Sequence, residues 1–132
     1  MTIRALIEGW EKAAPDAVYA LSTESTAQLT FADIAAGTRR IGALLQRQGL
    51  RAGDTVSLVM PNGLQTLRIL LGSMANGLII NPVNLLSQAE QMRYVLGHSD
   101  CKLVFVAPEG ETPVRGLLAG LDREVAVLVA DP

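Results

Sequence analysis

The chain has 132 residues, of which 49% are apolar and 18% charged, a composition typical of one compact globular domain rather than of a disordered segment. A formal net charge of −2 gives no basic field to attract nucleic acid or anionic lipid, so both classes of partner are disfavoured. Arg68 interrupts the longest apolar stretch, which argues against a membrane span, and residues 1–16 lack the regions of a signal peptide.

The first elements are predicted to be a helix and a hairpin. Apolar residues recur with helical spacing over the first dozen positions: Ile3, Leu6, Ile7 and Trp10. Two short β-prone runs then flank a polar stretch, at 17–21 and 28–30, and this pattern predicts a β-hairpin.

A second helix should follow the hairpin directly. Thr30 is its expected N-cap, and Asp33 occupies the position of a capping-box acid. Apolar residues form one broad face of this helix and arginines the other, and Gly49 is the expected C-terminal glycine.

From residue 55 onward, strands and helices alternate. The expected strands are 55–60, 78–81, 103–107 and 125–130, with helices at 64–75, 88–96 and 113–121. Continuous apolar strands in β-α-β alternation predict an α/β fold, with one parallel sheet covered by helices on both faces. Residues 1–132 are therefore predicted to form a single α/β subdomain. Its buried strand residues should include Val56, Leu58, Ile79, Ile80, Val104, Val106, Val127 and Val129.

Ligands of open parallel sheets bind beyond the carboxyl ends of the strands, so these ends are the first place to search for chemistry. No nucleophile stands beside a base there, and no glycine-rich phosphate loop occurs, so the sequence identifies neither catalytic residues nor metal ligands. Asn62 and Asn84 each follow a strand and precede a helix. They have two interpretations: helix capping, or contact with a ligand carried by another part of a larger protein.

Other potentially reactive side chains are interpreted as structural. His98 is the only histidine, and we expect it to be a surface residue or a cation at a helix C-terminus. Cys101 is the only cysteine; it is expected to be a small buried hydrophobic residue, and a single thiol is typical of the reducing cytoplasm. Arg39, Arg40 and Arg47 are interpreted as a solvated helix face rather than a phosphate site.

Four stretches form an ordered set of short motifs: Leu29–Ile34, Gly49–Val56, Met60–Asn62 and Asn76–Asn84, the last followed by Glu90, Tyr94 and Leu96. Together they resemble the amino-terminal part of the adenylate-forming superfamily, which includes acyl-CoA and aryl-CoA synthetases, firefly luciferase and the adenylation domains of peptide synthetases. The resemblance extends from about Ile3 to Val129.

The chain departs from this family at two places. Asn76 stands where the family usually has alanine. Leu85 and Leu86 stand where many acyl-CoA synthetases have Pro-Arg, so the loop lacks an arginine that lies near the CoA phosphates in some of those enzymes.

The resemblance implies an ATP-dependent acyl-CoA synthetase for a fatty or aryl acid. In such an enzyme a carboxylate attacks the α-phosphate of Mg-ATP to give an acyl adenylate, and the thiol of CoA then takes the acyl group. The family's phosphate loop, adenine and ribose motifs and catalytic lysine would all follow Pro132. We therefore expect the N-terminal portion of such a ligase, acting as a scaffold. ATP, Mg and CoA belong to the full-length enzyme, and the 132 residues alone should be inactive and bind no cofactor.

In this interpretation, the positions expected to approach the substrate or CoA channel are Pro61, Asn62, Asn84, Leu85 and Leu86. The expected partners are the remainder of the ligase chain and a carboxylic acid. Exposed apolar surface on the first helix or the last strand could also support a homo-oligomer. The alternative is a free-standing, non-catalytic α/β binding or interaction module. A complete nucleotide-binding domain is disfavoured because the phosphate loop is missing.

Overall fold

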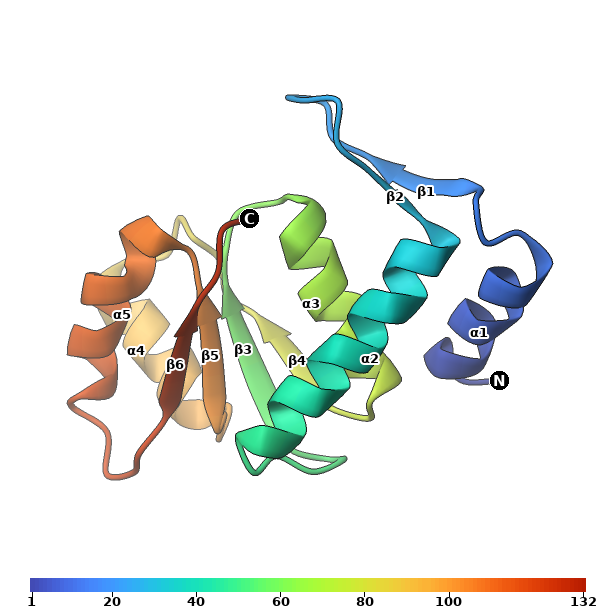
Figure 1. The fold of residues 1–132 in the computed structure, drawn as a ribbon. Coiled ribbons are helices and arrows are strands. Elements are labelled where there is room, and N and C mark those ends of the chain that lie inside the picture. The colour runs from blue at the N-terminus through green and yellow to red at the C-terminus, as the bar shows by residue number, and fades with distance from the viewer.

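The computed structural model describes residues 1–132 and shows an α/β fold with a separate hairpin (Figure 1). The elements in chain order are α1 (Ile3–Ala13), β1 (Val18–Leu21), β2 (Gln28–Thr30), α2 (Phe31–Arg47), β3 (Thr55–Val59), α3 (Leu64–Ala75), β4 (Ile79–Pro82), α4 (Ala89–His98), β5 (Leu103–Val106), the 3-10 turn η1 (Pro108–Gly110), α5 (Glu111–Leu118) and β6 (Ala126–Val129).

The sheet has the strand order β4-β3-β5-β6, and all three pairings are parallel. Helices α2 and α3 pack on one face, and α4 and α5 pack on the other (Figure 1). Strands β1 and β2 form a small antiparallel sheet of their own. The predicted fold class is thus confirmed, including the parallel sheet, the two helical layers and the N-terminal hairpin.

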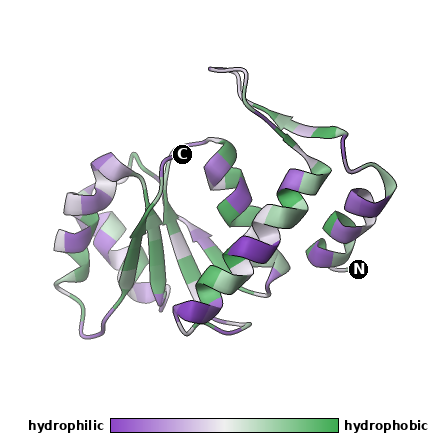
Figure 2. Cartoon of the chain, in the orientation of Figure 1, coloured by the Kyte–Doolittle hydropathy of each residue, from purple (hydrophilic) through white to green (hydrophobic).

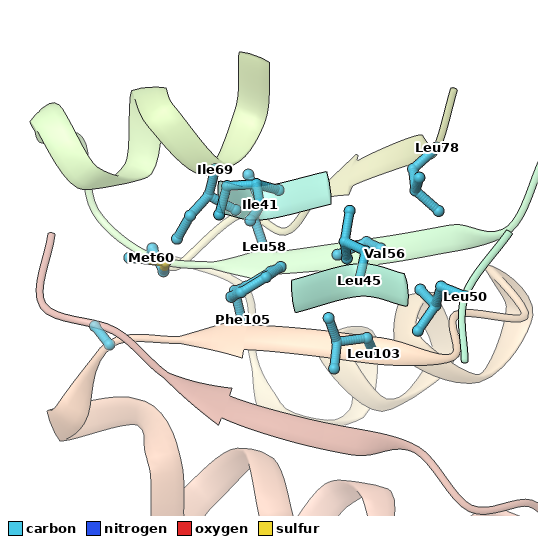
Figure 3. Packing of buried hydrophobic residues seen from close by; sticks show 11 residues of the cluster. Ile41, Leu45, Leu50, Val56, Leu58, Met60, Ile69, Leu78, Leu103 and Phe105 are labelled. Atoms are coloured by element: carbon cyan, nitrogen blue, oxygen red, sulfur yellow. The ribbon is translucent and has the colours of Figure 1, made fainter. Parts of the chain in front are cut away.

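The central strands β3 and β5 supply both halves of the core. Alternate side chains of a strand point to opposite faces, so β5 places Leu103 and Phe105 among α2 and α3, and Val104 and Val106 among α4 and α5. All four β5 residues are buried. Figure 3 shows Phe105 beside Leu58 on the α2 and α3 face. Figure 2 shows the sheet as largely apolar, whereas the helices carry both apolar and polar residues.

Two residues expected in the core are in fact exposed. Ile79 is 55% exposed and Val129 44% exposed, so the prediction of their burial was wrong. They lie on β4 and β6, the outer strands, each of which has a neighbour on one side only. Ile80 and Val127, on the same strands, are only half-buried and pack at the margin of the core.

Helix α2 begins and ends as its sequence predicts. The Thr30 hydroxyl accepts a hydrogen bond from the Asp33 N–H, and the Asp33 carboxylate accepts one from the Thr30 N–H, at 3.1 and 2.9 Å. At the other end Gly49 has a φ of 79°, which favours glycine, and the Leu50 N–H donates to the Leu45 carbonyl at 3.0 Å.

Helix α1 is attached to the body by few contacts and has no buried residue. Arg4 donates to the Ala75 carbonyl and to Asn76 Oδ1, at 3.2 and 2.8 Å, and Trp10 stacks on Phe31 with ring centroids 5.2 Å apart. Trp10 remains 52% exposed. None of the helices combines the length and the hydropathy needed to cross a bilayer.

Asn76, one of the departures from the family pattern, joins three helices. Its Nδ2 donates to the Gly72 carbonyl of α3 at 2.7 Å and to the Thr38 carbonyl of α2 at 3.0 Å, while its Oδ1 accepts from Arg4 of α1. Gly42 provides the space, because a Cβ atom there would lie 2.6 Å from Asn76 Oδ1. An alanine at position 76 would leave α1 without this link.

The capping box predicts a pH-dependent contribution to stability. The hydrogen bond from the Thr30 backbone lowers the pKa of Asp33 in the folded chain. The contribution is therefore fully present above the unfolded pKa of about 3.9 and is lost as the pH falls through the lower folded value. Asp33→Ala should lower the free energy of unfolding by up to about 1 kcal/mol near pH 7.

Urea denaturation at neutral and acidic pH measures this difference. Glu24→Ala is the matched control, since it removes the same charge from the exposed hairpin turn. If the difference in the free energy of unfolding between wild type and Asp33→Ala stays constant down to about pH 2, the carboxylate does not contribute in this way.

Candidate functional site

The candidate residues lie at the end of the sheet where the parallel strands have their carboxyl ends, which is called the carboxyl edge. Pro61 and Asn62 follow β3, and the loop Asn84–Leu86 follows β4, the neighbouring strand. Because the two strands are parallel, their carboxyl ends meet at the same edge, and the Val83 N–H donates to the Leu58 carbonyl there at 2.9 Å. The structure thus brings the two candidate segments to adjacent strand ends.

The segment after β3 is fixed by its backbone. The Pro61 carbonyl accepts a hydrogen bond from the Thr66 hydroxyl at 2.7 Å, which ties the loop to the first turn of α3. Gly63 lies against the last residue, because a Cβ atom at position 63 would be 2.6 Å from the carbonyl carbon of Pro132. Asn62 is exposed between these two constraints, and its side chain makes no hydrogen bond.

The segment after β4 is a turn closed on itself. Asn84 Oδ1 accepts from the Leu86 N–H at 2.9 Å, and the Ser87 N–H donates to the Asn84 carbonyl at 3.0 Å. The turn presents apolar side chains to solvent: Leu85 is 46% exposed and Leu86 92% exposed. No guanidinium or ammonium group lies in the turn, as its sequence indicated.

Helix capping does not explain either asparagine. Helix α3 has Gly63 at its N-cap with no side-chain hydrogen bond, and α4 is capped by Gln88 together with Gln91. The capping interpretation of Asn62 and Asn84 is therefore wrong. Asn84 stabilises its own turn, and the Asn62 side chain makes no hydrogen bond.

The loops that follow β3 and β4 contain no titratable side chain. The groups whose pKa shifts lie elsewhere; for example, the Lys102 ammonium, 2.8 Å from Asp54, lowers the pKa of that carboxyl at the amino end of the sheet. No group of three or more His, Cys, Asp or Glu side chains is close enough to hold a metal ion. The two candidate loops can therefore position or border a ligand, but they offer no nucleophile or general base; the carboxylates that follow the other two strands are Glu109 and Asp131.

The edge is also open rather than enclosed. The candidate residues line none of five pockets on the surface of the chain. One of those cavities, of about 410 Å³, is lined only by apolar side chains of α1, α2, α3 and the hairpin, and another, of about 630 Å³, lies between α5 and β6.

The structure agrees with the structural roles predicted for Cys101, His98 and Arg39. Cys101 is fully buried, and His98 ends α4, where it stacks on Tyr94 with ring centroids 5.3 Å apart. Arg39 is exposed as predicted, but it also forms a salt bridge with Glu11 of α1 at 3.0 Å. Sequence reasoning missed that pair, because the partners are 28 positions apart on different helices.

The sequence analysis also missed one buried polar contact between β3 and β4, near the carboxyl edge. Asn81 Nδ2 donates to the hydroxyl of Ser57, which is fully buried within β3, at 3.1 Å. A serine in an otherwise apolar strand was the available signal, because a buried hydroxyl needs a partner.

Comparison with known proteins gives matches over nearly the whole chain. A model of the AMP-binding enzyme family matches residues 7–132. The sulfoacetate–CoA ligase of Cupriavidus necator is 46% identical over 131 residues, which are 99% of this chain and 26% of that protein. The uncharacterized protein Rv1549 of Mycobacterium tuberculosis is 32% identical over 118 residues, 89% of this chain and 67% of that protein.

The fold also matches solved structures. The N-terminal domain of FACL13 from Mycobacterium tuberculosis superposes with a TM-score of 0.88 at 19% identity, covering 98% of this chain and 34% of that one. The chain thus spans about a quarter of the ligase and about a third of the solved domain.

The turn assignment of Asn84 predicts a small effect of its removal. Asn84→Ala should change the free energy of unfolding by less than about 0.5 kcal/mol, because only an exposed turn loses a bond. Thr30→Ala, at a true N-cap, should cost about 1 kcal/mol and is the control. Thermal or urea denaturation compares the two variants. If Asn84→Ala and Thr30→Ala lower the free energy of unfolding equally, Asn84 supports α4 after all.

Proposed function

The chain belongs to the family of AMP-binding enzymes, and we propose that it forms the N-terminal scaffold of an ATP-dependent acid–CoA ligase. The observation that carries this proposal is the family match over residues 7–132, together with 46% identity to a CoA ligase over nearly the whole chain. The ordered motifs from Leu29 to Asn84 agree with it.

The proposed reaction has two steps. A carboxylate oxygen attacks the α-phosphorus of ATP and pyrophosphate leaves, and then the sulfur of CoA attacks the acyl carbon and AMP leaves. Mg²⁺ would supply charge neutralisation of the phosphates. The residues of this chain do not fit the metal or the triphosphate, because they provide neither a ligand cluster nor a phosphate loop. We therefore assign no step of the reaction to them.

What these residues contribute is a rigid support. The doubly covered strands β3 and β5 hold the carboxyl edge, and the loops at Pro61–Asn62 and Asn84–Leu86 follow β3 and β4 there. We propose that these loops border the acid or CoA channel of the complete ligase. The exposed, unpaired side chain of Asn62 and the apolar side chains of Leu85 and Leu86 are available for such contacts.

The proposed substrate is a small carboxylic acid that carries a second anionic group. This choice follows the sulfoacetate–CoA ligase, because sulfoacetate is a two-carbon carboxylic acid with a sulfonate group. It departs from the fatty or aryl acid expected from the family resemblance, because a small acid with two anionic groups belongs to neither class.

A second candidate function is favoured by one observation. Rv1549 is a relative of which this chain covers 67% of the length, so it lacks room for several hundred further residues. A non-catalytic α/β module of this family is the corresponding function for the present chain. It would bind a partner without turning over ATP.

A chimaera tests the ligase proposal. The 131 aligned residues of the Cupriavidus necator ligase are replaced by those of this chain, and sulfoacetate-dependent pyrophosphate release is measured. We expect activity within about tenfold of the parent, a barrier difference of about 1.4 kcal/mol, because the scaffold should hold the same edge. The 132-residue chain alone should release no pyrophosphate.

The control chimaera carries Val104→Asp, which places an unpaired charge in the core and should abolish activity. A first chimaera that folds, as judged by circular dichroism and light scattering, but is inactive with sulfoacetate and other small acids would contradict the proposal. Pyrophosphate release by the isolated chain would contradict the assignment of its residues as a scaffold.

A further inference from the structure

The chain contains two Asn-Gly pairs, at 62–63 and 76–77, and the structure holds them in opposite ways. In an Asn-Gly pair the asparagine side chain can react with its own backbone, because glycine has no Cβ atom to hinder the approach of its nitrogen. The other two asparagines, Asn81 and Asn84, precede proline and leucine. The surroundings of the two pairs therefore decide which of them is free to react.

Both reacting groups are free at Asn62–Gly63. The Asn62 side chain is exposed and makes no hydrogen bond. Gly63 is the N-cap of α3, and its carbonyl accepts from the Leu67 N–H at 3.0 Å, but its own N–H donates to no backbone or side-chain acceptor. Neither the carbon of the Asn62 amide nor the nitrogen of Gly63 has to leave a hydrogen-bonded position before the two atoms meet.

Both groups are engaged at Asn76–Gly77. Asn76 Nδ2 donates to two helix carbonyls, at 2.7 and 3.0 Å, and Asn76 Oδ1 accepts from Arg4 at 2.8 Å. The Gly77 N–H donates to the Met74 carbonyl at 3.0 Å. Because these hydrogen bonds fix both the side chain and the backbone nitrogen, they must open before the two groups can react.

We propose that Asn62 is a site of spontaneous deamidation and that Asn76 is protected from the same reaction by its hydrogen bonds. The Gly63 nitrogen attacks Asn62 Cγ, the Cγ–Nδ2 bond breaks, and ammonia leaves with the proton of the Gly63 N–H. Water then opens the resulting succinimide ring, either at Cγ to give aspartate or at the backbone carbonyl carbon to give isoaspartate. Water thus replaces ammonia, and nothing is oxidised or reduced.

The fold can accommodate an aspartate at position 62 better than one at position 76. Helix α3 has no acidic residue in its first turn and no side-chain hydrogen bond at its N-cap, so a carboxylate directly before Gly63 is favourable there. At position 76 a carboxylate would lose both donated hydrogen bonds and would face the two helix carbonyls instead. The structure therefore tolerates the modification at the first pair and opposes it at the second.

Tryptic peptides distinguish the two sites, because cleavage after Arg51, Arg68 and Arg93 gives the peptides 52–68 and 69–93. The folded 132-residue chain is incubated in mildly alkaline buffer, and the deamidation of each peptide is followed over time by mass spectrometry, with fragmentation to locate the modified asparagine. We expect Asn62 to react at least about tenfold faster than Asn76, because Asn76 can react only during local opening.

Incubation in concentrated guanidinium chloride measures the reactivity of the two pairs without the fold. The two rates should become similar there, because the hydrogen bonds around Asn76 are lost. Asn62→Gln is the matched variant, since it keeps a primary amide but has to close a larger ring, which is slow. It should abolish deamidation in peptide 52–68 and leave the rate at Asn76 unchanged.

Three results would overturn the proposal. The first is an equal rate at Asn62 and Asn76 in a chain that circular dichroism shows to be folded. The second is a rate ratio that persists in guanidinium chloride, because hydrogen bonds of the folded chain would then not be its cause. The third is an Asn62 that reacts in guanidinium chloride but stays unmodified in the folded chain, which would show that its loop is protected.

Discussion

The structure depends on the burial of β5 from both sides. Leu103, Val104, Phe105 and Val106 are at most 2% exposed, and alternate residues enter two separate apolar clusters. Strand β3 lies beside β5 and does the same, so these two strands hold α2 and α3 to one face and α4 and α5 to the other. At roughly 25 cal/mol for each Å² of apolar surface removed from water, this double coverage is the main source of stability.

This burial also explains where contacts with other molecules can occur. The parallel order places the loops after β3 and β4 at one edge, fixed by backbone bonds but without catalytic groups. The outer strands receive only partial cover, so Ile79 and Val129 are left exposed. The fold thus combines a doubly covered centre with exposed loops at the carboxyl ends of two strands and with partly exposed outer strands.

Local features of this fold were predictable from sequence, and long-range ones were not. Continuous apolar runs predicted all four parallel strands, and Thr30, Asp33 and Gly49 marked the ends of α2, because capping depends on residues a few positions apart. The exposure of Ile79 and Val129 depends on strand order, which periodicity does not specify. Asn62 and Asn84 were correctly located at the edge, but capping was wrong for both, and the Arg4–Asn76 contact spans 72 positions.

Residue-resolved amide hydrogen exchange tests the central claim that a doubly covered two-strand core supports more weakly attached elements. The account predicts that amides of β3 and β5, such as those of Leu58 and Phe105, exchange only by global unfolding. Amides of α1 and of the hairpin should exchange by local opening, many times faster, because α1 has no buried residue. Protection in α1 equal to that in β5 would contradict the account.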